Sequence, residues 1–208
     1  MKLKKYLYTF MAVNLIGISI ALILESGLGC EPIGLFCEGI SKFFSIKFGI
    51  ASFFYNTLTI GFSLFFIRNN LGIGTISYGL LSGFFIDFYR EIFIFLNLKE
   101  SNTIILILAF IIGELFMSSA FAILMQLDLG MTALDTILIK IKVVTKLPYS
   151  FIKIGIDIIL VGMGIFLGGT FGLGTVISAL ITGVLVEKIG NFMKMKEIKK
   201  INKGDVLK

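Results

Sequence analysis

The sequence predicts an all-α polytopic membrane protein with six transmembrane helices, built as two inverted three-span repeats, each with a short amphipathic or re-entrant helix. Hydrophobic residues make up 57% of the 208 residues and charged residues 15%, whereas soluble domains carry about 25% charged residues. The mean hydropathy is +0.99, and at about 20 residues per span this length supplies six spans. The segment at 72–75, Gly-Ile-Gly-Thr, recurs 100 residues later at 172–175 as Gly-Leu-Gly-Thr, which indicates a doubled unit.

Further matches extend the repeat on both sides of these glycine segments. Downstream, matched residues lie 100 positions apart, and upstream they lie 101 apart. The matches predict one membrane domain over 1–208, with repeat 1 at 6–98, repeat 2 at 103–193 and a basic tail at 194–208. Matched residues in the third and sixth spans are Gly79 with Ala179, Gly83 with Gly183, and Asp87 with Glu187.

Six apolar segments are the predicted spans. The first follows a lysine cluster and could be a signal peptide, but it exceeds the about 7 to 15 apolar residues of a signal core, and its repeat partner near 105–125 cannot be a signal. Residues 92–96 either prolong the third helix or lie in the membrane interface. The predicted spans are 6–24, 49–67, 74–89, 103–125, 151–167 and 175–192.

A short helix is predicted after the first span of each repeat, at 33–45 and at 133–144. In the first, polar residues recur at helical spacing along one side, and the second has the same amphipathic character. Pro32 suits the first turn of the earlier helix. Thr132, with Asp135 three residues on, is an acidic relative of the capping box. Each helix either lies in the membrane interface or enters the protein as a re-entrant half-helix.

The glycines have two predicted uses. Gly29 and Gly130 precede the short helices, and if these are re-entrant, their free backbone amides at a positive helix end favour an anion. Small residues four apart in the third and sixth spans let helix backbones approach closely. These packing residues are Gly79, Gly83, Ala179 and Gly183.

Orientation follows from the odd number of spans in each repeat, since the second repeat must then enter the membrane from the opposite side. With the N-terminus inside, 15 of the 19 basic residues lie inside, as the positive-inside rule requires. We therefore expect both termini to be cytoplasmic. The expected partners of the protein are the lipid bilayer and, through the basic tail, anionic inner-leaflet lipids. The basic residues form no face interleaved with aromatics, so no nucleic-acid partner is expected.

The composition removes several kinds of chemistry. The chain has no histidine and two cysteines, Cys30 and Cys37, so no metal site and no cofactor are expected. The two cysteines are either free buried thiols or a disulfide on the external side. No nucleophile elbow or phosphate-binding loop is present in the sequence, and we expect that the protein is not an enzyme.

Two acids lie inside predicted spans, where charge is expensive: Glu114 in the fourth and Asp157 in the fifth. In the repeat alignment Asn56 corresponds to Asp157, and Asn14 lies one position from the residue that corresponds to Glu114. A pseudo-twofold axis would bring these four polar residues towards one central region, where inverted-repeat transporters bind solutes and ions. The alternative is that both acids are neutral and hydrogen-bond neighbouring helices.

Asp87 and Glu187 lie near opposite membrane faces in the inverted arrangement. Arg90 follows Asp87 by three residues, and Lys188 is adjacent to Glu187. Interfacial anchoring or gating at the two mouths are the alternatives for this pair.

The glycine segments, the turn at 28–32 (Leu-Gly-Cys-Glu-Pro) and the Gly83-x3-Asp87 spacing resemble the YczE/YyaS/YitT family of bacterial integral membrane proteins over roughly residues 10 to 190. In that family the first turn often reads Gly-x-x-Pro-Trp/Leu-Asp. Pro32 is kept here, with Gly34 at the acidic position, and in the second copy Asp135 is kept and Ala133 replaces the proline. The resemblance implies a polytopic plasma-membrane protein and names no substrate.

Three functions are compatible with these patterns. The first is a secondary transporter or channel for an unidentified small solute, using polar and acidic residues at the repeat interface. The second is a substrate-binding subunit of a larger importer, and the third is a non-transporting accessory or scaffold protein. A homo-oligomer is compatible with each.

Overall fold

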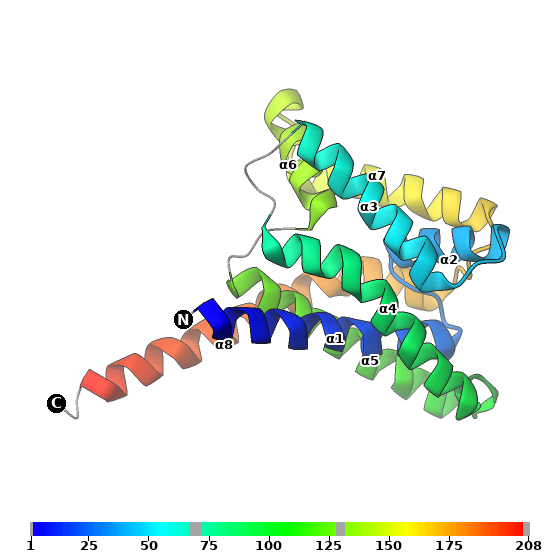
Figure 1. Cartoon of the computed structure of the whole chain (residues 1–208), viewed down its shortest axis with the longest axis horizontal. Coiled ribbons are helices and arrows are strands. Elements are labelled where there is room, and N and C mark those ends of the chain that lie inside the picture. The colour runs from blue at the N-terminus through cyan, green and yellow to red at the C-terminus, as the bar shows by residue number, and fades with distance from the viewer. Residues whose placement is uncertain (1, 67–71, 128–131, 206–208) are drawn as a thin grey trace.

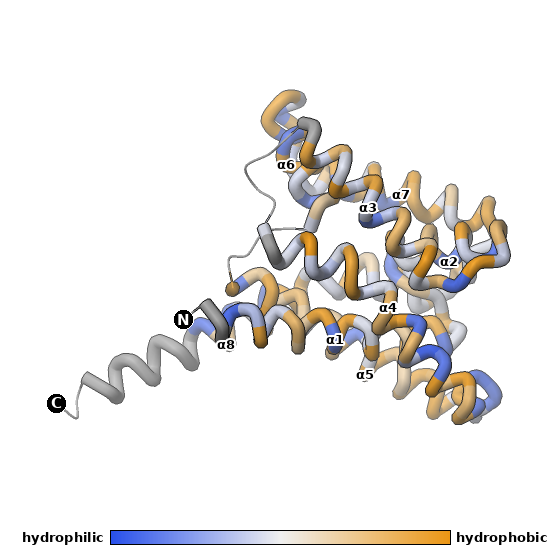
Figure 2. The backbone as a smooth tube through the Cα atoms, viewed as in Figure 1, coloured by the Kyte–Doolittle hydropathy of each residue, from blue (hydrophilic) through white to orange (hydrophobic). Residues whose placement is uncertain are grey.

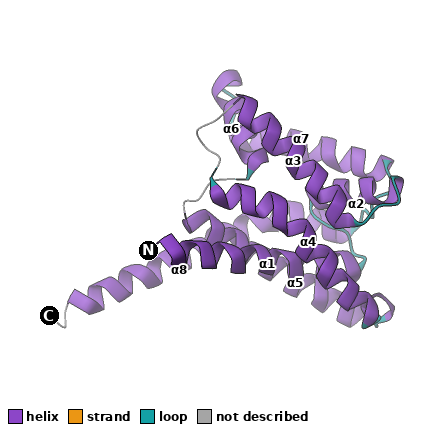
Figure 3. Ribbon diagram, viewed as in Figure 1, coloured by secondary structure: helices purple, strands orange, loops and turns teal. Residues whose placement is uncertain are grey.

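The computed structural model describes residues 2–66, 72–127 and 132–205, which form eight α-helices, one short 3₁₀ helix and no strand (Figures 1 and 3). The predicted all-α class is confirmed. The helices are α1 (Lys2–Ser26), α2 (Pro32–Phe43), α3 (Phe48–Phe66), α4 (Ile73–Phe95), η2 (Leu98–Glu100), α5 (Thr103–Leu127), α6 (Ala133–Thr145), α7 (Tyr149–Phe166) and α8 (Leu173–Asp205).

By length and composition, four of the described helices can cross a membrane. The apolar part of α3 is shorter, at Phe48–Leu64. Figure 2 shows hydrophobic residues along the lengths of the helices and hydrophilic residues mainly near their ends, as expected where the bilayer is the solvent. The four candidate spans are Lys5–Ser26, Thr103–Leu127, Tyr149–Phe166 and Leu173–Lys194.

Two helices run further than the sequence predicts. α4 continues to Phe95, so residues 92–95 prolong the third helix instead of forming a separate interfacial segment. α8 continues through most of the predicted basic tail to Asp205 as one unbroken helix. The tail side chains beyond residue 194 lie outside the described part of the chain.

The helices form two layers (Figure 1). In one layer α1 packs between α4 and α5, and α5 also packs against α8; in the other, α2 and α6 each pack against both α3 and α7. The layers meet mainly where α3 packs against α4. We call the end of the molecule with the N-terminus the terminal end, and the end where α1 and α4 finish the α2 end (Figure 1).

The buried apolar core centres on α1. Ile16 and Ile23 on this helix are fully buried and cluster with Met117 of α5 and Ile86 of α4. Because α1 has neighbours on two sides, it is the most enclosed of the candidate spans.

Candidate functional site

Glu114 is a buried acid between α5 and α8. The residue is 5% exposed, and its carboxylate accepts hydrogen bonds from the hydroxyls of Ser178 and Thr182. Thr182 Oγ1 lies 3.0 Å from Glu114 Oε2 and 2.7 Å from the Ser178 carbonyl oxygen, and its single proton serves one acceptor at a time. Among the described residues Glu114 has no ion-pair partner. A carboxylate held only by hydroxyls is suited to exchange a proton or bind a cation.

Glu31 is a second inward-lying acid, and sequence reasoning missed it. It precedes α2 at the N-cap position, and Cys30 Sγ donates to its carboxylate over 2.7 Å. Burial raises the pKa of Glu31; the Cys30 hydrogen bond lowers it, the nearby Glu114 carboxylate raises it further, and Lys153 lowers it. Glu31, Glu114 and Lys153 are therefore electrostatic neighbours from α1–α2, α5 and α7. The missed signal was the match of Glu31 with Thr132, the residue predicted to cap the second short helix.

Asp157 on α7 has a partner on its own helix. Lys153 Nζ lies 3.0 Å from Asp157 Oδ2, with 16% of the Asp157 side chain exposed. Asn56 of α3 donates to Ser52 Oγ at 3.3 Å, and Asn14 of α1 accepts from the Tyr89 hydroxyl at 2.9 Å. Among the described residues, no hydrogen bond or ion pair joins any two of Asn14, Asn56, Glu114 and Asp157. Each of the four residues therefore contacts a different partner, and the four side chains share no contact with one another.

The two short helices begin with acidic groups near their N-termini. Pro32 occupies the first turn of α2, as predicted. Thr132 caps α6, since its Oγ1 accepts from the Asp135 amide at 3.1 Å and donates to Asp135 Oδ2 at 2.7 Å. Asp135 also accepts from the Tyr149 hydroxyl at 2.6 Å. Glu31 and Asp135 thus supply the negative charge that the predicted anion would have brought to these helix ends.

Gly29 lies in a tight contact between distant parts of the chain. It has a φ of +99°, and a Cβ there would lie 2.4 Å from Thr175 Oγ1. The Gly174 amide donates to the Leu28 carbonyl at 2.8 Å, so the turn before α2 is held against the start of α8. The matched Gly130 lies outside the described residues.

A polar cluster ties α2 to the turn between α7 and α8. Glu38 accepts from the Thr170 amide at 2.9 Å and from its hydroxyl at 2.8 Å, and pairs with Lys42 at 2.8 Å. Burial alone would raise the pKa of Glu38, but hydrogen bonds from Lys42 and Thr170 outweigh it and the pKa is lowered. Glu38 is therefore a charged residue that holds α2 against the turn between α7 and α8.

The seam between α3 and α4 is tightly closed. The Gly49 amide donates to Asp87 Oδ1 at 2.7 Å. A Cβ on Gly83 would lie 2.4 Å from the Gly49 carbonyl oxygen, and a Cβ on Gly79 would lie 2.5 Å from Ile60 Cδ1. Gly79 and Gly83 thus occupy the close helix contact predicted for them.

The matched residues of α8 make no such contact. Ala179, Gly183 and Glu187 are exposed, and a Cβ on Gly183 would meet nothing within 4 Å. The expected close packing at Ala179 and Gly183 is therefore not found in this structure. The reason is that α8 packs against α5 through the side that carries Ser178 and Thr182.

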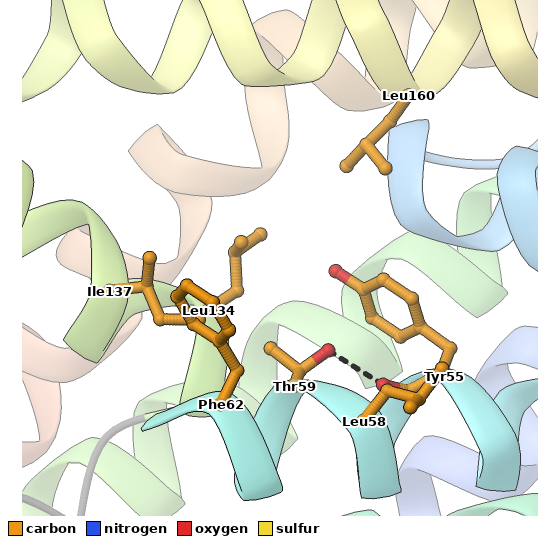
Figure 4. A pocket seen from close by; sticks show the side chains of 7 residues that line it. All are labelled: Tyr55, Leu58, Thr59, Phe62, Leu134, Ile137 and Leu160. Carbon is orange, nitrogen blue, oxygen red and sulfur yellow. Dashed lines mark hydrogen bonds between the residues drawn. The ribbon is translucent and has the colours of Figure 1, made fainter. Parts of the chain in front are cut away.

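An open cavity of about 400 Å³ lies between α3, α6 and α7 (Figure 4). Of the atoms drawn there, the Tyr55 and Thr59 hydroxyls supply the polar groups, and Thr59 donates to the Tyr55 carbonyl at 2.6 Å. The lining is otherwise apolar, so the acids Glu31 and Glu114, which we call the polar centre, are the stronger candidate site. The lining residues are Tyr55, Leu58, Thr59, Phe62, Leu134, Ile137 and Leu160.

Both cysteines are free and buried, which favours the free-thiol alternative over the disulfide. Within the described ranges, no three side chains of the metal-binding types come close enough to hold a metal ion.

Comparison with known proteins places the chain in a family. The family described as "Family of unknown function (DUF6198)" matches residues 3–191. The chain is 23% identical over 183 residues to the uncharacterized membrane protein YczE of Bacillus subtilis (strain 168), a match that covers 88% of this chain and 83% of YczE. It is 22% identical over 188 residues to the uncharacterized protein YyaS of the same organism, covering 88% of this chain and 90% of YyaS. No solved structure matches.

These matches confirm the resemblance to YczE and YyaS, and with the apolar helices they indicate an integral membrane protein. The chain belongs to the DUF6198 family.

Proposed function

We propose that the protein is a secondary transporter of the bacterial plasma membrane that moves a small solute, with six spans as two inverted repeats and both termini cytoplasmic. The observation that carries the proposal is Glu114, a buried carboxylate in a candidate span that is held by two hydroxyls and has no ion-pair partner among the described residues. Glu31 comes from repeat 1, whereas Glu114 and Lys153 come from repeat 2, and the two latter groups lie close enough to act on the charge of Glu31. Inverted-repeat transporters bind their solutes at such an interface.

Local geometry at matched positions supports the repeat. Ser45 and Lys146 lie 101 residues apart and both adopt a left-handed conformation, at φ 52° and 57°, after the two short helices. A non-glycine residue with positive φ is uncommon, so this coincidence favours a shared ancestral turn. Glu31 and Thr132, also 101 apart, hold the two N-cap positions.

The packing of the helices supports an inverted arrangement. If α1–α4 match α5–α8, the contact of α1 with α4 has its counterpart in α5 with α8, and that of α2 with α7 in α6 with α3. A polar contact at matched positions joins each of the pairs α1–α4 and α5–α8. Arg90 Nε donates to Glu25 Oε1 at 2.8 Å, and Gln126 Nε2 donates to the Gly190 carbonyl at 2.8 Å. A twofold axis between α1 and α5 accounts for all of these contacts.

The polar centre can be tested for access to water. In a Cys30→Ser/Cys37→Ser background, Ser178→Cys should react with a membrane-impermeant maleimide from one side of the membrane, because solute and ion must reach Glu114. A cysteine at this buried position that stays unreactive from both sides would contradict a pathway and favour the accessory-protein alternative.

Coupling can be tested in proteoliposomes that contain the pH-sensitive dye pyranine. A panel of small organic acids, amines and sugars is added under an imposed pH gradient. A solute that moves protons with the parent protein should fail to do so with Glu114→Gln or Glu31→Gln, because the amide cannot exchange the proton. Glu100→Gln, at an exposed acid, is the matched control. Normal proton movement in both central variants would exclude these acids from coupling.

The basic tail has a separate proposed role. Six of the lysines follow residue 193, and α8 continues through this segment as far as Asp205. We propose that the tail contacts anionic lipids of the inner leaflet. Removal of 194–208 should lower binding of the purified protein to phosphatidylserine nanodiscs relative to phosphatidylcholine nanodiscs and leave solute movement unchanged.

A further inference from the structure

We infer that the protein closes two matched seams in alternation, and that this structure holds the seam between α3 and α4 closed and the seam between α7 and α8 open. In the other state, Glu187 accepts a hydrogen bond from the Ser150 amide beside Gly183, while α3 separates from α4. This inference rests on the proposed function, because it names the contacts that would shut the same central site from each side in turn.

The closed seam is built from a helix start and a carboxylate. The Gly49 amide lies in the first turn of α3, where backbone donors have no partner within the helix, and it donates to Asp87 Oδ1. Gly83, one turn before Asp87, lets the two backbones approach until a Cβ would collide with the Gly49 carbonyl. The contact thus needs a free amide, an acid and a small residue.

The same three parts are present and unused in the second seam. Ser150 matches Gly49 and lies in the first turn of α7, and its amide has no hydrogen-bond partner among the described residues. The next two amides make the same hydrogen bonds in both helices. Ile50 and Ala51 donate to the Lys47 carbonyl, and Phe151 and Ile152 donate to the matched Pro148 carbonyl. Only the amide that reaches across the seam differs.

The acceptor side is equally free. Glu187 matches Asp87 and is exposed, with no hydrogen bond or ion pair among the described residues. Gly183 has open space where a Cβ would stand. Ser150 carries a Cβ that Gly49 lacks, so the helices can approach less closely, and the glutamate is one methylene longer than the aspartate it matches. The longer acid fits the wider seam.

The layered fold supplies the movement. The layer of α2, α3, α6 and α7 touches the layer of α1, α4, α5 and α8 mainly at the α3–α4 seam. Rocking one layer on the other exchanges the closed seam for its counterpart without breaking contacts inside either layer, which is rigid-body alternating access. Since the closed contact at Gly49 lies at the α2 end, the open seam faces the terminal end, which is the cytoplasmic side in the proposed orientation (Figure 1).

Paired cysteines in the Cys30→Ser/Cys37→Ser background test this in native membranes. Lys47→Cys/Glu91→Cys replaces an ion pair of 2.5 Å across the closed seam. Pro148→Cys/Asn191→Cys stands at the matched positions of the open seam. Both pairs should cross-link with copper phenanthroline, and the fraction of free thiols is read from gel shifts with polyethylene-glycol maleimide. Formation of the first cross-link should lower formation of the second at least several-fold.

The role of Glu187 has its own control. Glu187→Ala should lower cross-linking of Pro148→Cys/Asn191→Cys several-fold, whereas Lys188→Ala, at the adjacent exposed residue, should leave it unchanged. A second readout avoids any change at Pro148: Gly183→Cys should react with an impermeant maleimide from the terminal side, and should react faster once the Lys47→Cys/Glu91→Cys cross-link has formed.

Three results would overturn the inference: no cross-link at the second seam while the first forms, both cross-links together in most molecules, or an unreactive Gly183→Cys. The outcome is separable from the proposed function. Alternating cross-links without solute movement would support the alternating seams and contradict the proposed transport. Solute movement that depends on Glu114, without a second cross-link, would support transport and contradict the alternating seams.

Discussion

The two seams between matched helices carry nearly the same residues and differ in whether they are closed. Between α3 and α4, Gly83 lies against Gly49 and Asp87 binds a helix-start amide. Between α7 and α8, the corresponding Gly183 and Glu187 are exposed. The comparison shows that a small-residue pattern permits close helix packing, while the arrangement of the surrounding layers decides whether the contact forms. Variants in the two seams test this comparison directly.

The largest effect is expected for a side chain placed in the closed seam. In Gly83→Val the Cβ alone would lie 2.4 Å from the Gly49 carbonyl oxygen. Overpacking of this kind lowers the free energy of unfolding by about 3 kcal/mol. Gly183→Val is the matched control, and it should change the free energy of unfolding by less than about 0.5 kcal/mol. The two values come from SDS titrations of mixed micelles. Equal losses at both positions would mean that the second seam is also closed.

The next effect separates the two matched polar contacts beside α1 and α5. Glu25→Gln installs the residue found at the matched position and leaves Arg90 without its carboxylate; the Glu25 side chain is 5% exposed and that of Arg90 29%. Loss of one partner of a fully buried pair costs about 3 to 5 kcal/mol, and since Arg90 keeps some water we expect about 2 kcal/mol.

Gln126→Ala removes the neutral counterpart, a single hydrogen bond to the Gly190 carbonyl, and should cost about 1 kcal/mol. The same SDS titration measures both variants. A larger loss for Gln126→Ala than for Glu25→Gln would show that the second repeat depends more on this contact than the first.

The sequence located these helices well because apolar runs and turn glycines are local signals. Predicted spans such as 6–24 and 103–125 agree with α1 and α5 to within a few residues. The partner of Asp157 was also within reach, since Lys153 lies four residues away on the same helical face.

What the sequence could not supply depends on contacts between distant segments. Glu31 lies in a turn, has no helical period, and matches a threonine instead of an acid, so the effect of the Glu114 charge on it follows only from the fold. The open seam is a property of one state of the molecule. The matched glycines Gly83 and Gly183 predict a contact that each can make, but not which of the two contacts is made in a given state.

A smaller effect compares two acids near the start of α2. Burial raises the pKa of Glu31, so its ionised form costs stability as pH rises above the value of about 4.3 in the unfolded chain. The pKa of Glu38 is lowered, so its charge adds stability above the unfolded pKa and loses it as pH falls through the folded value. At pH 7.5, Glu31→Gln should therefore raise the midpoint of thermal unfolding and Glu38→Gln should lower it.

Scanning calorimetry in detergent at pH 7.5 and pH 4 checks the sign of both shifts. The difference between the variants should shrink at pH 4, because Glu31 then carries its proton in the parent protein and Glu38 loses part of its charge. Shifts of the same sign at pH 7.5 would contradict the opposite environments of the two acids.

The smallest effect is expected at the rim of the closed seam. The ion pair between Lys47 and Glu91 joins side chains that are 64% and 65% exposed, and exposed pairs contribute little because water and salt screen them. Lys47→Ala should leave the midpoint of thermal unfolding unchanged within error at 150 mM salt, whereas Asp87→Ala, which removes the acceptor of the Gly49 amide, should lower it. If Lys47→Ala were the more damaging change, the surface pair would hold the seam, and the buried contact between Gly49 and Asp87 would follow from it. The second seam, with Pro148 and Asn191 at the matched positions, would then have nothing to close it.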